Sequence, residues 1–190
     1  MFAEIFSLVV DTLSLLYLTV ILMRFILQLS RADFYNPISQ FIVKATNPLL
    51  IPIRRLIPGI AGIDIASLVL AVLFQSLVLA LKVAVLGAVM PNPVGVLVMS
   101  VMLVLGFLLK IYFWSLLIMI IGSWVAPGSG NPVLLLINQI TEPLMKPFRK
   151  ILPSMGGLDL SPILVFLVLQ ILEKVVAQMS YQVGISFSLI

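Results

Sequence analysis

Residues 46–64 read TNPLLIPIRRLIPGIAGID, and residues 141–159 read TEPLMKPFRKILPSMGGLD. Both stretches place prolines and basic residues at the same intervals, and both end in an aspartate. They lie 95 residues apart (141 − 46), which is half of the 190 residues in the chain. An offset that holds over loops and apolar stretches alike indicates two copies of one structural unit. We therefore predict a first repeat over residues 1–95 and a second repeat over residues 96–190.

The same offset relates identical residues outside these two stretches. The further pairs are Tyr17 and Tyr112, Asn36 and Asn131, Pro37 and Pro132, and Gln75 and Gln170. Each unit contains an apolar stretch, a proline-rich stretch with Arg and Lys, and a second apolar stretch. The repeat thus predicts the same order of elements in both halves of the chain.

The composition indicates an integral membrane protein. Sixty-two per cent of the residues are apolar, 9% are charged, and the mean hydropathy is +1.27. A soluble domain is nearer half apolar and one quarter charged. The start of the chain, MFAEIF, carries an acid where a signal peptide carries bases, so we interpret the first apolar stretch as a span rather than a leader.

Four apolar stretches are long enough to cross a bilayer, which takes about 20 residues. We predict helices near 3–29, 64–90, 95–125 and 160–181, with a tight turn at PNP, 91–93, between the second and the third. Because each unit then crosses the membrane twice, both copies enter from the same side and form parallel repeats. The predicted fold is an all-α membrane protein with four transmembrane helices in two parallel tandem repeats.

The basic residues indicate the orientation. Most of them lie between the first and second spans or between the third and fourth: Arg31, Lys44, Arg54, Arg55, Lys146, Arg149 and Lys150. The loop and the termini on the other side carry no Lys or Arg. By the positive-inside rule both basic segments are cytoplasmic. We expect a multi-pass protein of the bacterial inner membrane with both termini in the periplasm.

The two basic segments, 36–58 and 131–153, have apolar residues at helical spacing. Asn36 and Asn131 are predicted N-caps followed by proline, and Thr46 and Thr141 are predicted to restart each helix after a proline bend. We interpret each segment as an amphipathic helix at the cytoplasmic interface. Its cations would bind anionic lipid headgroups or a protein partner: Lys44, Arg54, Arg55, Lys146, Arg149 and Lys150.

Two other interpretations of the basic segments stay open. The cations could serve only to fix the topology, because basic flanks are the default at cytoplasmic ends of spans. The segments could also be re-entrant, with their helix breaks lining a cavity. Asp64 and Asp159 could be ligands, but we predict that they are helix caps, because each precedes an apolar helix whose first amides need acceptors.

Several polar residues fall inside the predicted spans, where ionisable groups need partners. Parallel repeats put Lys110 about one turn from the level of Asp11, so we predict that the two form a pair. Gln75 and Gln170 occupy equivalent places and could bond each other near the pseudo-axis, and the alternative is that they serve helix packing alone. Lys174 and its neighbour Glu173 are two further charges within these apolar stretches. The favoured interpretation is a set of neutral pairs that hold the bundle together, and the other is a proton or ion relay.

The chemistry available to the chain is limited. It has no His and no Cys. These residues supply the commonest general base, thiolate nucleophiles and most zinc and haem ligands. No glycine-rich phosphate loop is present either. We therefore predict a non-enzymatic protein with no cofactor, no metal site and no nucleic-acid partner.

The pattern N-P, then T-x-P-L-x-x-P-x-R-[RK], then P-x-x-x-G-x-D and a downstream Q resembles the YggT family, also called YlmG-like. The first copy carries it at Asn36, Pro37, Thr46, Pro48, Pro52, Arg54, Pro58, Asp64 and Gln75, and the second at Asn131, Pro132, Thr141, Pro143, Pro147, Arg149, Pro153, Asp159 and Gln170. The resemblance implies a small membrane protein without an established activity. It also implies roles in division, envelope organisation and osmotic tolerance for bacterial members, and in cytochrome b maturation and thylakoid or nucleoid organisation for plastid relatives.

These observations favour a membrane scaffold or assembly factor that contacts anionic lipid and a membrane or cytoplasmic protein. A homo-oligomer is compatible with the pattern. The alternative is a small oligomeric channel or transporter for ions or osmolytes that uses Asp11, Lys110, Gln75 and Gln170. Because four helices enclose little volume, such a pore would need several copies of the chain.

Overall fold

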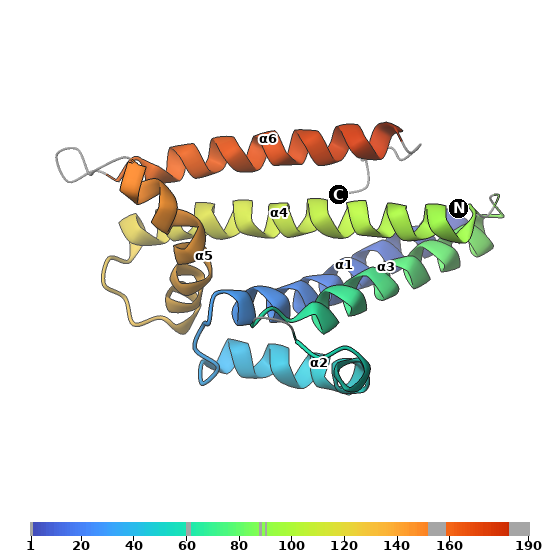
Figure 1. Cartoon of the computed structure of the whole chain (residues 1–190), viewed down its shortest axis with the longest axis horizontal. Helices are drawn as coiled ribbons and strands as arrows, with labels where there is room; N and C mark the ends of the chain where they lie inside the picture. Colours follow the sequence, from blue (N-terminus) through green and yellow to red (C-terminus); the bar gives the residue numbers. More distant parts are fainter. Residues whose placement is uncertain (1, 60–61, 88, 90, 152–158, 183–190) are drawn as a thin grey trace.

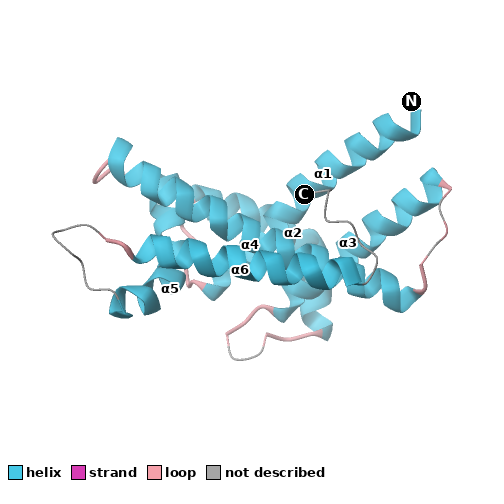
Figure 2. Cartoon of the chain, turned by 90° about the horizontal axis from the view of Figure 1, so that it is seen from above, coloured by secondary structure: helices cyan, strands magenta, loops and turns pink. Residues whose placement is uncertain are grey.

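The structure is a computed structural model that describes residues 2–59, 62–87, 89, 91–151 and 159–182. In this part of the chain all regular structure is helical and no strand is present (Figure 2). The helices are α1 (Phe2–Leu29), α2 (Pro37–Leu56), α3 (Ile65–Leu86), α4 (Pro93–Val125), α5 (Pro132–Ile151) and α6 (Ser161–Gln182). Four of them, α1, α3, α4 and α6, are long and apolar enough to span a membrane. The prediction of an all-helical chain with four helices long and apolar enough to span a membrane is confirmed.

The sequence explains where the helices begin and end. Asn36 is the N-cap of α2, where its side chain accepts a hydrogen bond from the Ile38 amide, and Pro37 follows at the first helical position. Asn92 caps α4 in the same way. Gly87 ends α3 with a left-handed backbone (φ 66°), which glycine adopts without steric cost. α3 therefore ends at Leu86, before the predicted limit of residue 90.

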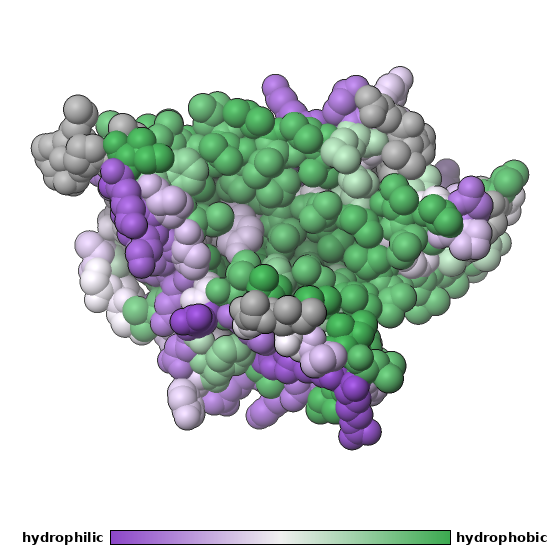
Figure 3. Space-filling model, in the orientation of Figure 1, coloured by the Kyte–Doolittle hydropathy of each residue, from purple (hydrophilic) through white to green (hydrophobic). Residues whose placement is uncertain are grey.

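The spans form a layered bundle in which α4 is central (Figure 1). α3 and α6 both pack against α4, and α1 packs against α3. Buried apolar residues of α1 and α4 dominate the core, including Ile21, Leu22, Ile26 and Leu116. α6 contacts α4 and α5. Apolar residues cover most of the visible surface of the spans, whereas hydrophilic residues gather over α2 and α5, with smaller groups along the upper edge and at the right-hand end (Figure 3).

The two short helices pack against the spans that precede them, α2 against α1 and α5 against α4. α2 is continuous from Pro37 to Leu56 although Pro48 and Pro52 lie inside it. The Thr46 hydroxyl donates to the Ile42 carbonyl at 2.8 Å and lies 3.3 Å from the Val43 carbonyl. The prediction that Thr46 restarts the helix is therefore wrong, because a donor to the preceding turn continues a helix instead of capping a new one.

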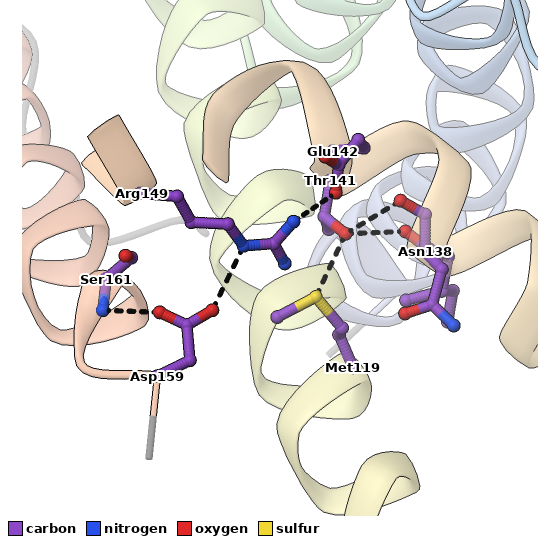
Figure 4. Close-up of polar contacts among 8 residues, drawn as sticks. Met119, Asn138, Thr141, Glu142, Arg149, Asp159 and Ser161 are labelled. Atoms are coloured by element: carbon purple, nitrogen blue, oxygen red, sulfur yellow. Dashed lines mark hydrogen bonds and ion pairs between the residues drawn. The ribbon is translucent and has the colours of Figure 1, made fainter. Parts of the chain in front are cut away.

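Thr141 of α5 shows the same departure from the prediction. Its hydroxyl donates to the Ile137 carbonyl at 2.8 Å and lies within hydrogen-bond distance of the Asn138 carbonyl and the Met119 sulfur (Figure 4). α5 is helical through Pro143 and Pro147, and its ribbon changes direction along its length (Figure 1). The prolines bend the helix, as loss of a backbone donor predicts, but they do not divide it.

Candidate functional site

Five of the six cations predicted to bind headgroups are exposed on α2 and α5, and four of these five have no partner among the described residues. The four without a partner are Lys44, Arg55, Lys146 and Lys150. None of the four forms a hydrogen bond or ion pair with another residue in the described part of the chain. Their charged groups are therefore available to an external ligand. We call these four residues the free basic set.

The fifth cation, Arg54, is half-buried and bonded to other residues of the chain. Its guanidinium donates to the Gln28 side-chain oxygen at 3.1 Å and to the Asp64 carboxylate. Asp64 is 2% exposed and also accepts bonds from the amide and hydroxyl of Ser67. Burial on its own raises the pKa of this carboxyl, but the bonds from Arg54 and Ser67 outweigh it and hold the pKa below its usual value. Arg54 thus fastens the end of α2 to the start of α3.

The sixth cation, Arg149, forms the corresponding contact in the second half (Figure 4). Its guanidinium donates to Asp159 at 3.0 Å and to Glu142 at 2.7 Å. These side chains are far more exposed than Asp64, with 42% for Arg149 and 41% for Asp159. Although desolvation opposes it, the pKa of Arg149 is raised by hydrogen bonds and charge attraction from both carboxylates. This pair is therefore more accessible to water than the Arg54–Asp64 pair.

Asp64 and Asp159 also bond the amides at the start of the spans that follow them. Asp64 is the N-cap of α3. The Ser161 amide, in the first turn of α6, donates to Asp159 at 2.9 Å. Each aspartate therefore serves a helix N-terminus and an arginine ten residues before it. The sequence prediction assigned the aspartates to capping and the arginines to lipid, and did not connect them. The equal spacing of ten residues from Arg54 to Asp64 and from Arg149 to Asp159 was the available signal.

Sequence reasoning also missed Arg24, which lies within α1. Arg24 is 7% exposed, and its Nε and Nη1 atoms have no hydrogen-bond partner among the described residues. Its guanidinium stacks over the Phe34 ring at 5.2 Å from the centroid, a cation–π contact. The residue 95 positions later is Met119, so the repeat gave no signal for Arg24. A lone arginine inside an apolar stretch was the only indication.

The N-terminal end of α2 and the loop before it bond the N-terminal half of α5. The Asn36 side chain donates from Nδ2 to the Pro132 carbonyl at 2.7 Å. The Asp33 amide donates to the Gln139 side-chain oxygen at 2.8 Å. These bonds connect residues about 100 positions apart in the sequence. The N-terminal ends of the two basic helices are therefore tied together.

The path of α2 bears on whether it lies at the interface or enters the bilayer. The Tyr17 hydroxyl donates to the Ala45 carbonyl at 3.2 Å, close to Pro48. Tyr17 lies twelve residues before Leu29, the last residue of α1, or about 18 Å along the helix axis. α2 therefore runs beside α1 to about the middle of that span, and does not leave it at its end.

Asp11 is paired with Lys82 rather than with Lys110. The Lys82 ammonium donates to both carboxylate oxygens, at 2.7 and 2.9 Å. The predicted Asp11–Lys110 pair is wrong because α1 packs beside α3, which brings Lys82 to Asp11. Lys110 lies in a separate apolar hollow between α1 and α4, beside Trp114. The sequence indicated that a lysine lies at the depth of Asp11 in the membrane. It did not indicate which helix carries the lysine that pairs with Asp11.

The bond that the sequence allowed between Gln75 and Gln170 is not formed in the described structure. Gln75 lies with Asp11 and Lys82 around a cavity of about 230 Å³ between α1, α3 and α4. Gln170 is exposed on α6, and α3 and α6 pack on α4 from different sides (Figure 1). The two amides are separated because α4 lies between the helices that carry them. In the described residues, no group of three or more Asp and Glu side chains could hold a metal ion.

Comparison with known proteins gives a family and a set of bacterial relatives. The family described as CCB3/YggT matches residues 3–86 and again residues 98–180. The chain is 54% identical over 169 residues to an uncharacterized protein of Pseudomonas aeruginosa, covering 88% of this chain and 86% of the relative. It is 37% identical to the uncharacterized protein YggT of Escherichia coli K12, covering 89% and 87%. A shorter match, 39% identical over 64 residues, covers 32% of this chain and 24% of the chloroplastic YlmG homolog protein 2 of Arabidopsis thaliana. No solved structure matches the chain.

Proposed function

The chain belongs to the CCB3/YggT family of membrane proteins, and from this we propose that it is a non-enzymatic scaffold that gathers anionic lipid and a protein partner at the cytoplasmic face. The observation that carries the proposal is the free basic set on α2 and α5. The four cations are exposed and unpaired in the described structure, whereas Arg54 and Arg149 form ion pairs with aspartates of the same chain. Cations beside a bilayer attract anionic headgroups, each contributing on the order of 1 kcal/mol.

The amphipathic interpretation of α2 and α5 is part of this proposal. The buried residues of α2 are Ser39, Ile42, Thr46 and Leu50, which recur every three or four positions and so share one face. The cations Lys44 and Arg55 lie off this face. α5 has the same division, with Ile140 and Met145 buried and Lys146 exposed. Such helices would keep their bases toward headgroups while their other face holds the spans.

The tandem organisation and the shared side of the two basic helices also belong to the proposal. The two family matches begin 95 residues apart (98 − 3), and the bounds of α5 lie 95 residues after those of α2. Within each half the first span packs against the short helix and against the second span. These observations support parallel repeats with both basic helices at the cytoplasmic side of the inner membrane. The bonds between their N-terminal ends would then make one composite docking surface.

The proposed binding of anionic lipid is tested with the full chain reconstituted in vesicles. Trp114 and Trp124 on α4 are the only tryptophans and serve as energy donors to dansyl-labelled lipid. We expect stronger transfer to dansyl-labelled phosphatidylglycerol than to dansyl-labelled phosphatidylcholine. The preference should fall with added salt and disappear when Lys44, Arg55, Lys146 and Lys150 are all changed to Gln.

The matched control exchanges Lys and Arg at the same four positions and so keeps every charge. It should keep the preference for the anionic lipid. A preference that persists in the glutamine variant would refute the proposed binding of anionic lipid.

The proposed binding of a protein partner is tested by photo-crosslinkers placed at positions 44 and 146 in native membranes. Capture of one common protein from both positions supports it, and capture of none contradicts it.

A second candidate function is favoured by the cavity beside the Asp11–Lys82 pair. Its walls combine this ion pair with Gln75, Thr12 and Ser14 inside an otherwise apolar bundle. Polar cavities within spans mark substrate or ion pathways in many membrane proteins. A small transporter would use this site, and solute flux into proteoliposomes that is lost with Asp11→Asn and Lys82→Met would favour it over the scaffold.

A further inference from the structure

α6 differs from the other spans in what its exposed surface carries. One side packs against α4, with Val165 and Leu169 buried and the Phe166 ring 5.1 Å from that of Phe113. The remaining surface includes Gln170, Lys174 and Gln178, which are all exposed. Gln170 and Lys174 lie about 14 and 20 Å from the start of a helix about 33 Å long. They therefore fall near the middle of a candidate membrane span, where polar groups facing lipid are unfavourable.

The charges beside this surface have no partner in the described structure. Lys174 forms no hydrogen bond or ion pair with another described residue, and the same is true of Glu173. The two are neighbours in sequence, and successive helical residues point about 100° apart, so they do not face each other within one helix. The positions outside the described residues carry no Lys, Arg, Asp or Glu, so side chains of opposite charge for this ammonium and carboxylate would come from another chain.

Residues along this surface, all exposed except the half-buried Ala177, follow the spacing of a two-stranded coiled coil. Residues that alternate four and three positions apart form one line along α6: Ile163, Leu167, Gln170, Lys174, Ala177 and Tyr181. We call this line the α6 seam. Ile163 is 64% exposed, Leu167 54% and Tyr181 73%. Lys174 occupies a core position of the seam, and Glu173 occupies the flanking position that precedes it.

The seam is complementary to itself. Copies of one chain insert into a membrane in the same orientation, so two copies are related by an axis along the membrane normal and each residue meets its counterpart at the same level. In a parallel pair of helices the flanking Glu173 of one copy then lies beside Lys174 of the other, and the reverse pair forms by symmetry. Gln170 meets its own counterpart, and an amide can both donate and accept.

We propose that the chain forms a symmetric dimer through the α6 seam, held by two reciprocal Glu173–Lys174 ion pairs and by bonds between the Gln170 amides. A second copy is the occupant that satisfies both charges at once, because it supplies an acid and a base at the required level. A different membrane protein would have to carry the same two charges in the same order. The proposal is independent of lipid binding by α2 and α5.

The first test uses the absence of cysteine from the chain. Single cysteines are placed on the seam with Leu167→Cys and Ala177→Cys, and beside it with Val168→Cys and Val175→Cys, which are 38% and 48% exposed in the native chain. Under mild oxidation of the reconstituted full chain, the seam cysteines should form disulfide dimers several-fold faster than the two controls. Equal yields at all four positions would overturn the proposal.

The second test exchanges the charges. Glu173→Lys and Lys174→Glu each leave like charges facing each other, so each should lower the dimer fraction several-fold in single-molecule photobleaching in vesicles. The double variant Glu173→Lys with Lys174→Glu restores two reciprocal pairs and should recover dimerisation, which also excludes misfolding as the cause of the single losses. Failure of the double variant to recover overturns the proposal. Seam cross-links in native membranes that reach only a different protein overturn it as well.

Discussion

At the scale of single residues, the two halves use the same Arg–Asp spacing in different surroundings. Arg54 meets Asp64, whose side chain is 3% exposed, whereas Arg149 meets Asp159 and Glu142, which are 41% and 52% exposed. A buried carboxylate that loses its cation stays desolvated, while an exposed one is solvated by water. The same loss should therefore cost more stability in the first half than in the second.

Arg54→Gln is accordingly predicted to lower the free energy of unfolding by about 2 kcal/mol, because it leaves the Asp64 carboxylate without its cation. Arg149→Gln is expected to cost less than about 1 kcal/mol, as is usual for exposed ion pairs. The measurement is equilibrium unfolding of the full chain in mixed micelles with increasing SDS. Arg55→Gln is the matched control, since Arg55 is exposed and has no hydrogen bond or ion pair with another described residue to lose. Equal effects at positions 54 and 55 would contradict the assigned role of Arg54.

The bonding partner of a residue could be predicted only where the partner lies nearby in the sequence or where the repeated pattern limits the choice. Asn36 and Asp64 could be assigned to helix starts because capping is local. Lys82 could not be assigned to Asp11, because hydropathy gives the level of a charge but not the face of the helix that carries it. The role of Arg24 was not predicted, because the corresponding position in the second half of the sequence is Met119 and the residues around Arg24 are apolar.

At the scale of the elements, α2 is the helix whose position matters most. The contact of Tyr17 with the Ala45 carbonyl places the middle of α2 well along α1, while Arg54 returns to Gln28 near the end of α1. Pro48 removes the amide that would bond the Lys44 carbonyl, which allows the helix to bend here. The middle of α2 should therefore lie deeper in the membrane than its C-terminal end.

Single cysteines at positions 44 and 55 measure this difference in depth. We expect a membrane-impermeant maleimide to label Arg55→Cys faster than Lys44→Cys when added to vesicles from the side that exposes α2. Lysine can reach the headgroups along its four-carbon stem, but the shorter cysteine stays at the level of the backbone. Equal rates after denaturation provide the control for intrinsic reactivity. Equal rates in the native state would place α2 flat at the surface.

The element boundaries were largely predictable, and the bends were not. Proline, asparagine and glycine act locally, so the starts of α2 and α4 and the break between α3 and α4 could be read from the sequence. The continuity of α2 and α5 depends instead on Thr46 and Thr141, which are buried against the spans. Whether a threonine caps a new helix or bonds the preceding turn is decided by packing, which local patterns do not contain.

At the scale of the whole molecule, the four spans and their order were predictable from hydropathy and length alone. The arrangement with α4 at the centre was not, because apolar spans offer similar surfaces on all sides. The sequence indicated a symmetric bundle in which Gln75 and Gln170 could meet. The structure instead leaves α6 at one side, packed on α4 and α5.

The proposed topology predicts the side of the membrane from which single cysteines are labelled. In right-side-out and inverted vesicles, cysteines at positions 55 and 146 should react from the same side, and a cysteine in place of Asn92 should react from the opposite side. The reason is that two spans separate the basic segments, and α3 alone separates Arg55 from the α3–α4 turn. Labelling of positions 55 and 146 from opposite sides would exclude parallel repeats and a shared docking surface.

The bonds from Asn36 to Pro132 and from Asp33 to Gln139 have a mechanical consequence. The first of these bonds joins the N-terminal ends of α2 and α5, about 27 Å of helix before the C-terminal ends that carry Arg55 and Lys150. A load that pulls on one of these C-terminal ends is transmitted through the joined N-terminal ends to the other helix. A force from stretching or bending of the surrounding bilayer would therefore act on both halves of the molecule together.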